Sequence, residues 1–436
     1  MKNIIIFITA IIILASTACA SKTPASAVEE PVPTIALVED DQAQEGIKPT
    51  EPIDEPTTTD VSSEDLQETK IVVDSRGVEV EIPVDPQRVV SVSDALVEEV
   101  MTVFGIQDRV IGIGSTCLIR DFTYDFETIA GEKFSYSGGM NPANYLNPDL
   151  IDQPFFVKPG TEMNFETLAS LEPDVLIIDV GACTLPWKTD KEAMEQGIER
   201  LESLGIPTIV LMGPNSGGTL EIGALSGVIK ILGEVFNHEV EAEELAVYLE
   251  DSIQLVIERT QDIPEDQRAT VLLLGLNPDV RTEGGVGQVS GNKDIQSYFV
   301  EEIVHAKNAF SGETTSLLNL EQILALDPEV IILPTWNGYH PPRELYEVNH
   351  FQNIQSLKAI ENHRVGALPW SPCNCDKRLE YPIDVYVIAK VTYPELFEDI
   401  DLSEWILQFY QDVYKISEED AMGLLEVQWM EWTLEE

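Results

Sequence analysis

The residues of this 436-residue chain with the most distinctive chemistry are its cysteines. Four of the five follow stretches predicted as buried strands, and they are Cys117, Cys183, Cys373 and Cys375. Cysteines that only fill a core would be scattered through strands and helices as small hydrophobic residues. Thiolates that meet in one cleft would suit a soft or borderline metal, or an iron–sulfur species. Cys373 and Cys375 are closer together than in the usual zinc motif, so a structural zinc finger is not expected.

Two other interpretations of these four thiols stay open. Disulfides are common in exported proteins, and the plausible pair is Cys117 with Cys183, because both fall in the same half of the chain. A bond between Cys373 and Cys375 would close a strained ring, and a bond between the halves would lock the cleft. The remaining interpretation is that the thiols are free and have no function, as can occur in an anaerobic organism.

Aromatic and basic side chains occupy the same stretches after strands. The rings offer flat apolar faces for a macrocycle or an organic chelator, and the cations could hold carboxylates of an anionic ligand. His340 could bind a metal directly or as an axial ligand. The alternatives are packing of loops, salt bridges to neighbouring acids and a surface histidine in an exposed turn. The candidate ligand-binding residues are therefore Cys117, Arg120, Cys183, Trp187, Trp336, Tyr339, His340, Trp370, Cys373, Cys375 and Arg378.

An internal repeat predicts the elements that position these residues. Residues 164–178 match residues 319–333 in order and in type. Each copy starts with an asparagine suited to cap a helix, followed by an acid in the first turn, Glu166 or Glu321. Each continues through leucines at helical spacing and an acidic-Pro-acidic break, and ends in a β-branched run typical of a strand buried on both faces.

The alternation of strands and helices predicts an α/β fold with two Rossmann-like lobes and a ligand cleft between them. We expect an N-terminal lobe over residues 70–220, a long connecting backbone helix over 221–262 and a C-terminal lobe over 263–436. One large doubly wound domain is the alternative. The repeat favours two separate sheets.

The N-terminal segment reads as an export signal and a tether. Residues 1–18 combine Lys2, a short apolar run and small residues before Cys19, which we expect to be lipidated; simple secretion is the alternative. Residues 19–69 are acidic, rich in proline and poor in aromatics, as in a disordered tether. The formal charge of −51 disfavours nucleic-acid partners.

The ordered set of motifs resembles the periplasmic binding proteins for iron–siderophore, haem and cobalamin uptake. The resemblance rests on residues 74–82, 86–91 and 393–397 together with the two acidic-Pro-acidic strand entries. It implies a non-enzymatic monomer that delivers a ligand to an ABC permease and its ATPase. It also implies that Glu166 and Glu321, one on each lobe, dock on the permease, although both fit as ordinary first-turn acids.

These observations predict an extracytoplasmic, lipid-anchored protein that captures an iron or other metal complex. A siderophore, haem, a corrinoid and a thiol-ligated iron–sulfur species all fit the candidate residues. The alternatives are an exported metal- or redox-active protein that uses the cysteine-lined cleft, and a ligand sensor without transport. The enzyme alternative lacks support, because the chain has no H-E-x-x-H, G-x-S-x-G or C-x-x-C motif.

Overall fold

The computed structural model forms one compact unit from Asp65 to Glu436. The residues that it describes are 68–118, 122–157, 163–181, 191–214, 220–282, 285–334, 340–370 and 378–435. The predicted signal segment, Cys19 and nearly all of the predicted tether lie outside these residues.

The first lobe is built on a parallel sheet with the strand order β4-β3-β7-β8. Apart from one partly covered residue in β4, these strands are buried along their whole length, as expected for a sheet covered on both faces. The strands are β3 (Val89–Val92), β4 (Val110–Ile113), β7 (Val175–Asp179) and β8 (Thr208–Leu211), and the helices around them include α1 (Leu96–Val103), α3 (Phe165–Ser170) and α4 (Lys191–Glu202).

The second lobe has its own sheet, with the order β12-β10-β9-β13-β14 and β11 beside β9. Strands β9, β13 and β14 run parallel, whereas β10 pairs antiparallel with β9 on one side and with β12 on the other. Its strands are β9 (Thr270–Gly275), β10 (Gly287–Val289), β11 (Lys307–Asn308), β12 (Ser316–Leu318), β13 (Val330–Leu333) and β14 (Val365–Ala367), with helices α7 (Pro278–Thr282), α8 (Ile295–Tyr298), α9 (Leu320–Leu326), α10 (Pro342–Glu347) and α11 (Lys358–Glu361).

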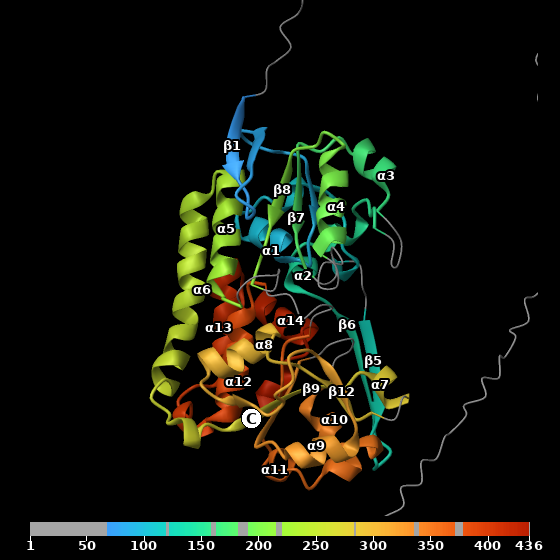
Figure 1. Cartoon of the computed structure of the whole chain (residues 1–436), viewed down its shortest axis with the longest axis vertical. Helices are drawn as coiled ribbons and strands as arrows, with labels where there is room; N and C mark the ends of the chain where they lie inside the picture. Colours follow the sequence, from blue (N-terminus) through green and yellow to red (C-terminus); the bar gives the residue numbers. More distant parts are fainter. Residues whose placement is uncertain are drawn as a thin grey trace, which may run out of the picture. The chain divides into compact units, whose positions relative to one another are not determined.

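The two sheets confirm the two-lobed prediction (Figure 1). The strand of the repeat has the same place in the strand order of each sheet. Strand β7 lies between β3 and β8, and β13 lies between β9 and β14. The two capping asparagines also behave as predicted: Asn164 accepts from the amide of Thr167, and Asn319 accepts from that of Gln322 in a full capping box.

The connecting region contains two helices, so the prediction of one uninterrupted helix was wrong in this detail. Helix α5 (Gly223–Phe236) ends at Asn237 in a left-handed conformation, and the longer α6 (Glu239–Thr260) runs beside it. Gly233 permits the close approach, because a Cβ atom there would lie 2.5 Å from that of Ala242.

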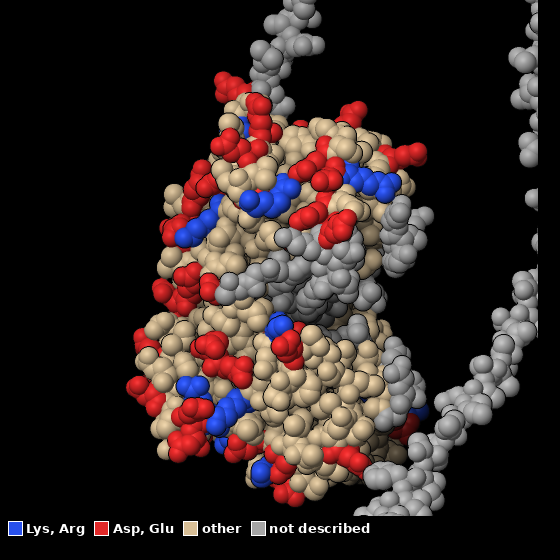
Figure 2. Space-filling model, in the orientation of Figure 1, with Lys and Arg blue, Asp and Glu red and all other residues tan. Residues whose placement is uncertain are grey.

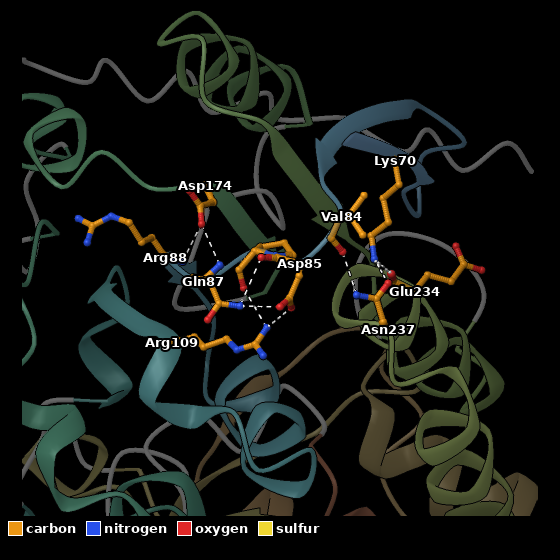
Figure 3. Close-up of polar contacts among 10 residues, drawn as sticks. Lys70, Val84, Asp85, Gln87, Arg88, Arg109, Asp174, Glu234 and Asn237 are labelled. Carbon is orange, nitrogen blue, oxygen red and sulfur yellow. Dashed lines mark hydrogen bonds and ion pairs between the residues drawn. The ribbon is translucent and has the colours of Figure 1, made fainter. Parts of the chain in front are cut away.

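The acidic-Pro-acidic breaks connect elements of each lobe at the start of its strands, and Figure 3 shows the contacts of Asp174 in the first lobe. The Asp174 carboxylate accepts the backbone N–H groups of Gln87 and Arg88 at 2.8 and 3.0 Å. Glu329 does the same for Thr270 at 2.9 Å in the second lobe. In each lobe, the acidic residue after the helix therefore holds the backbone at the start of the first strand of its own sheet by hydrogen bonds.

C-terminal helices and two hairpins complete the folded unit. One continuous hydrophobic core runs from α1 through α5 and α6 to the C-terminal helices, so the lobes share buried surface. The remaining elements are the hairpins β1 (Thr69–Val73) with β2 (Glu79–Pro83) and β5 (Phe122–Glu127) with β6 (Lys133–Gly139), and the helices α2 (Pro142–Leu146), α12 (Tyr381–Thr392), α13 (Leu402–Tyr414) and α14 (Glu418–Val427).

Candidate ligand-binding site

Four of the predicted ligand-binding residues fall within the described part of the chain: Cys117, His340, Trp370 and Arg378. All four side chains are buried. The predicted residues that lie outside the described part are Arg120, Cys183, Trp187, Trp336, Tyr339, Cys373 and Cys375. The predicted four-cysteine metal set is therefore described at one position only.

Cys117 lies in a single 3-10 turn directly after β4, at the carboxyl edge of the first sheet. Its backbone amide donates to the Ser115 hydroxyl at 3.2 Å, and that hydroxyl donates to Asp94 at 2.7 Å. The side-chain amide of Asn141 donates to the Cys117 carbonyl at 3.5 Å. These contacts fix the backbone that carries the thiol.

Arg378 joins the two lobes through a buried charge cluster. Its Nε lies 3.5 Å from an oxygen of Glu99, which comes from α1 of the first lobe, and 3.7 Å from an oxygen of Glu380. The amide of Leu379 donates to Glu99 at 3.4 Å, and the Tyr414 hydroxyl donates to Glu380. The cluster therefore contains two carboxylates and one guanidinium, removed from water.

Burial sets the protonation of this cluster. It raises the pKa of Glu99 well above the ordinary value, and repulsion from Glu380 adds to the rise, while Arg378 opposes it. Burial likewise raises the pKa of Glu380 against the opposing attraction of Arg378. Burial alone would lower the pKa of Arg378, but Glu99 and Glu380 raise it, and Cys117 lies close enough to add to their effect.

Part of the guanidinium has no hydrogen-bond acceptor among the described residues. Arg378 Nη1 is buried, and no described residue accepts a hydrogen bond from it. A buried charged donor without an acceptor is uncommon and calls for an anion or a water. The Arg378 guanidinium and the Cys117 thiol are therefore both buried at the junction of the lobes, close enough to affect each other electrostatically.

His340 belongs to a second buried cluster rather than to an exposed turn, which corrects the surface alternative. Its Nδ1 lies 2.6 Å from Glu344, and Glu344 also pairs with Arg281 and accepts from the Tyr124 hydroxyl at 2.6 Å. Burial would raise the pKa of Glu344, yet His340 and Arg281 bring it below the ordinary value. His340 Nε2 is buried, and no described residue forms a hydrogen bond with it.

Trp370 is enclosed by other aromatic rings. Its ring centroid lies 5.6 Å from that of Phe122 and 5.5 Å from that of Trp429. Only 1% of the residue is exposed, so its ring packs in the core as the alternative interpretation described, and its contact with a ligand stays a prediction. The cluster also includes Tyr124 and Phe126.

Comparison with known proteins identifies the family. The family model described as "Periplasmic binding protein" matches residues 137–371, which is more than half of the chain. This chain belongs to the periplasmic binding protein family.

Individual relatives resemble this binding protein over most of its folded part. The molybdate-binding protein MolA of Haemophilus influenzae is 23% identical over 297 residues, covering 62% of this chain and 75% of MolA. The structure of MolA bound to molybdate has a TM-score of 0.56 at 20% identity and covers 80% of this chain and 98% of MolA.

Two further solved structures share the fold. A periplasmic solute-binding protein from Veillonella parvula has a TM-score of 0.60 at 21% identity, covering 83% of this chain and 98% of its own. Helicobacter pylori CeuE with Ni(II) bound has a TM-score of 0.55 at 18% identity, covering 81% and 99% respectively. At these identities the likeness shows the fold alone.

Membership of the family makes this binding protein an extracytoplasmic component of an ABC importer, and such components are not enzymes. They work with a permease and an ATPase. Across the part of the chain that the structure describes, no helix is long and apolar enough to cross a membrane, and no three His, Cys, Asp or Glu residues form a metal-binding group.

The acids predicted to contact the permease are both exposed. Glu166 lies in the first turn of α3 in the first lobe, and Glu321 lies in the first turn of α9 in the second (Figure 1). Acidic side chains are also spread over both lobes on the face that Figure 2 shows. The position of the two glutamates on separate lobes agrees with the docking prediction, which the structure leaves as a prediction.

Sequence reasoning missed the partners of the candidate residues. Glu99, Glu380, Tyr124, Arg281 and Glu344 supply the buried charges, yet none was singled out. One signal for these charges was available in the sequence. Glu98 and Glu99 are adjacent in segment 96–103, whose other residues are mostly aliphatic, and acids in such an apolar helix are expected to be buried and to need partners.

Proposed function

We propose that this binding protein captures an iron complex or another metal complex between its lobes and delivers it to the permease. The observation that carries the proposal is the burial of the Cys117 thiol and the Arg378 guanidinium together where the lobes meet. A thiolate favours a soft or borderline metal, and a guanidinium favours anionic groups of a chelator.

The remaining candidate residues extend this proposal. Cys183, Cys373 and Cys375 would complete a thiolate set for an iron–sulfur species or a thiol-ligated metal. Trp187, Trp336 and Tyr339 would pack against a siderophore, haem or corrinoid, and Arg120 would add a second cation. Their contribution stays a proposal that rests on the sequence.

Delivery would follow from the two-lobe plan. A ligand that contacts both lobes stabilises their closed arrangement, and the spacing of Glu166 and Glu321 on the two lobes depends on that arrangement. The 22-residue α6 that accompanies the junction favours small changes over wide opening. We further propose that Cys19 anchors a monomer to the membrane through lipid.

An oxyanion such as molybdate is the second candidate ligand. Arg378 Nη1 favours it, because this buried nitrogen has no acceptor among the described residues and a tetrahedral oxyanion would accept from it. The named ligand of the Haemophilus influenzae relative points in the same direction. A metal complex remains the first candidate because an oxyanion gives the Cys117 thiol no role.

The test is anaerobic purification followed by metal analysis, an absorption spectrum and titration with sodium molybdate. We expect close to one equivalent of a metal complex per chain, with a large loss in Cys117→Ser and in Arg378→Lys. Arg109→Met is the matched control, because Arg109 pairs with Asp85 away from the lobe junction (Figure 3).

The outcomes separate the candidates. Tight molybdate binding that is lost in Arg378→Lys but kept in Cys117→Ser would replace the metal complex with an oxyanion. Unchanged metal content in both variants would remove these two residues from the site. Turnover of the bound metal species would instead favour a redox protein.

A further inference from the structure

The β5–β6 hairpin connects the two lobes. It leaves the first lobe just after the Cys117 turn and returns to it at α2. Its base is held there, because the side chains of Asn141 and Asn144 donate to the carbonyls of Cys117 and Leu118 at 3.5 and 2.7 Å. Figure 1 shows its strands running down beside the second lobe.

The tip of the hairpin is fixed to the second lobe by backbone contacts. The amide of Ile129 donates to the carbonyl of Glu347 at 2.9 Å. Thr128 forms an antiparallel bridge with Val348, directly after α10. In addition, the Arg343 guanidinium of α10 lies 4.9 Å from the ring centroid of Phe134 in β6.

The middle of the hairpin is fixed by a buried polar contact. The Tyr124 hydroxyl donates to Glu344 at 2.6 Å and accepts from Arg281 at 3.0 Å, so one hydroxyl bridges both members of an ion pair. Tyr124 is 7% exposed and Glu344 is fully buried. Hydrogen bonds to charged partners away from water are among the stronger ones in proteins.

Aromatic packing joins the hairpin to the C-terminal part of the chain. Tyr124 and Phe126 share a cluster with Trp370 and Trp429. Gly139 allows the contact, because a Cβ atom there would lie 2.7 Å from the Trp429 ring. The amide of Met140 donates to the carbonyl of Val427 at 3.2 Å.

We propose that the β5–β6 hairpin is an interlobe strap, with the contact of Tyr124 to Glu344 and Arg281 as its fastening. The strap limits how far the lobes separate. It also connects the Cys117 turn of one lobe to the His340–Glu344 pair of the other, so movement at either candidate site is transmitted to its counterpart. This consequence for capture rests on the proposed function, but the strap itself does not.

The first experiment measures amide hydrogen exchange in the full chain without added solute. Tyr124→Phe removes only the hydroxyl that bridges Glu344 and Arg281. We expect the Ile129 amide at the tip to exchange roughly tenfold faster or more. Tyr248→Phe is the matched control, because it removes a hydroxyl bonded to Asp412 on α13 and leaves the strap intact. Equal exchange at Ile129 in the wild type and Tyr124→Phe would overturn the fastening.

The second experiment shortens the strap. Phe122 and Gly139 are partners in the strand register, so residues 123–138 can be replaced by two glycines without stretching the base. We expect a larger radius of gyration in small-angle scattering and faster exchange across α10. An unchanged radius would overturn the limit on lobe separation. Should this variant fail to fold, the Tyr124→Phe comparison decides alone. Neither readout uses a ligand, so failure here leaves the proposed function standing.

Discussion

Arg378 is the cation that pairs with the two buried carboxylates of the lobe junction, Glu99 and Glu380. Replacing it with methionine keeps the aliphatic bulk and leaves Glu99 and Glu380 facing each other. We expect Arg378→Met to lower the free energy of unfolding at pH 8 by about 3–5 kcal/mol, as for other broken buried pairs. Urea unfolding measures this loss.

Removing the opposing charges should rescue that variant. Arg378→Met combined with Glu99→Gln and Glu380→Gln is expected to recover most of the lost stability, because no buried charge then lacks a partner. A triple variant as unstable as Arg378→Met would show that packing, and not charge, explains the loss.

Glu98 makes the stability of the fold depend on pH. Burial raises its pKa from the ordinary 4.5 to about 7, against the opposing hydrogen bond from Ser91. Below pH 4.5 the carboxyl is protonated in both the folded and the unfolded chain. Between pH 4.5 and 7 only the unfolded chain releases the proton, so stability falls by up to about 3 kcal/mol and stays lower above pH 7.

Glu98→Gln should remove this contribution. The free energy of unfolding of the wild type decreases from pH 4.5 to pH 8, and in the variant this decrease is expected to be smaller by up to about 3 kcal/mol. Denaturant unfolding at several pH values measures the difference, and the exposed Glu166→Gln is the control that keeps the wild-type slope. Parallel curves for Glu98→Gln and wild type would contradict the buried location.

At the residue scale, the sequence identified groups but not their partners. Cys117 and Arg378 were selected because each follows a stretch of predicted strand and carries a distinctive group, and their contact with a ligand stays a prediction. The pairing of Glu99 with residues 378–379 was not, because it joins positions 280 apart and depends on how the lobes pack. His340 was misjudged for the same reason: two following prolines suggested an exposed turn, whereas Tyr124 and Glu344 cover it.

The second acid of the acidic-Pro-acidic break makes the same kind of contact in both lobes, a hydrogen bond to backbone N–H groups at the start of a strand. Asp174 holds the amides of Gln87 and Arg88, and Glu329 holds that of Thr270 (Figure 3 for Asp174). We expect Asp174→Ala and Glu329→Ala each to lower the free energy of unfolding by about 1–3 kcal/mol, since backbone donors lose charged acceptors.

Thermal or urea unfolding measures these two losses. Asp266→Ala, at an exposed position in a 3-10 turn, is the control and should change stability by less than about 0.5 kcal/mol. Losses no larger than that of the control would show that the repeated acids do not fasten the strands.

At the element scale, the repeat predicted most of the architecture. Buried β-branched runs located β7 and β13, and capping asparagines located the starts of α3 and α9. The sequence did not predict the β5–β6 hairpin, because the residues that it packs against belong to the second lobe. The break between α5 and α6 also escaped, because charged and apolar residues keep their helical spacing on both sides of Asn237.

At the scale of the whole molecule, delivery depends on a strongly acidic protein meeting its permease. We expect Glu166→Lys with Glu321→Lys to keep solute binding and stability while lowering permease affinity and uptake at least tenfold, because each lobe loses its complementary charge. Uptake by vesicles that contain the importer measures this. Glu192→Lys with Glu361→Lys is the matched control of equal charge change.

The two-lobe plan was predictable because each lobe repeats a local pattern, and its two sheets confirm it. The junction was predictable only in part. Its residues come from segments far apart in the chain, and seven of the eleven predicted ligand contacts lie outside the described residues.

Anomalous diffraction at the iron absorption edge, from crystals of the anaerobically purified protein, tests the account most directly. We predict a peak between the lobes, at bonding distance from the Cys117 sulfur or, for a chelated metal, with the chelator contacting Arg378. A metal bound away from both residues, or a metal-free solute at the junction, would contradict it.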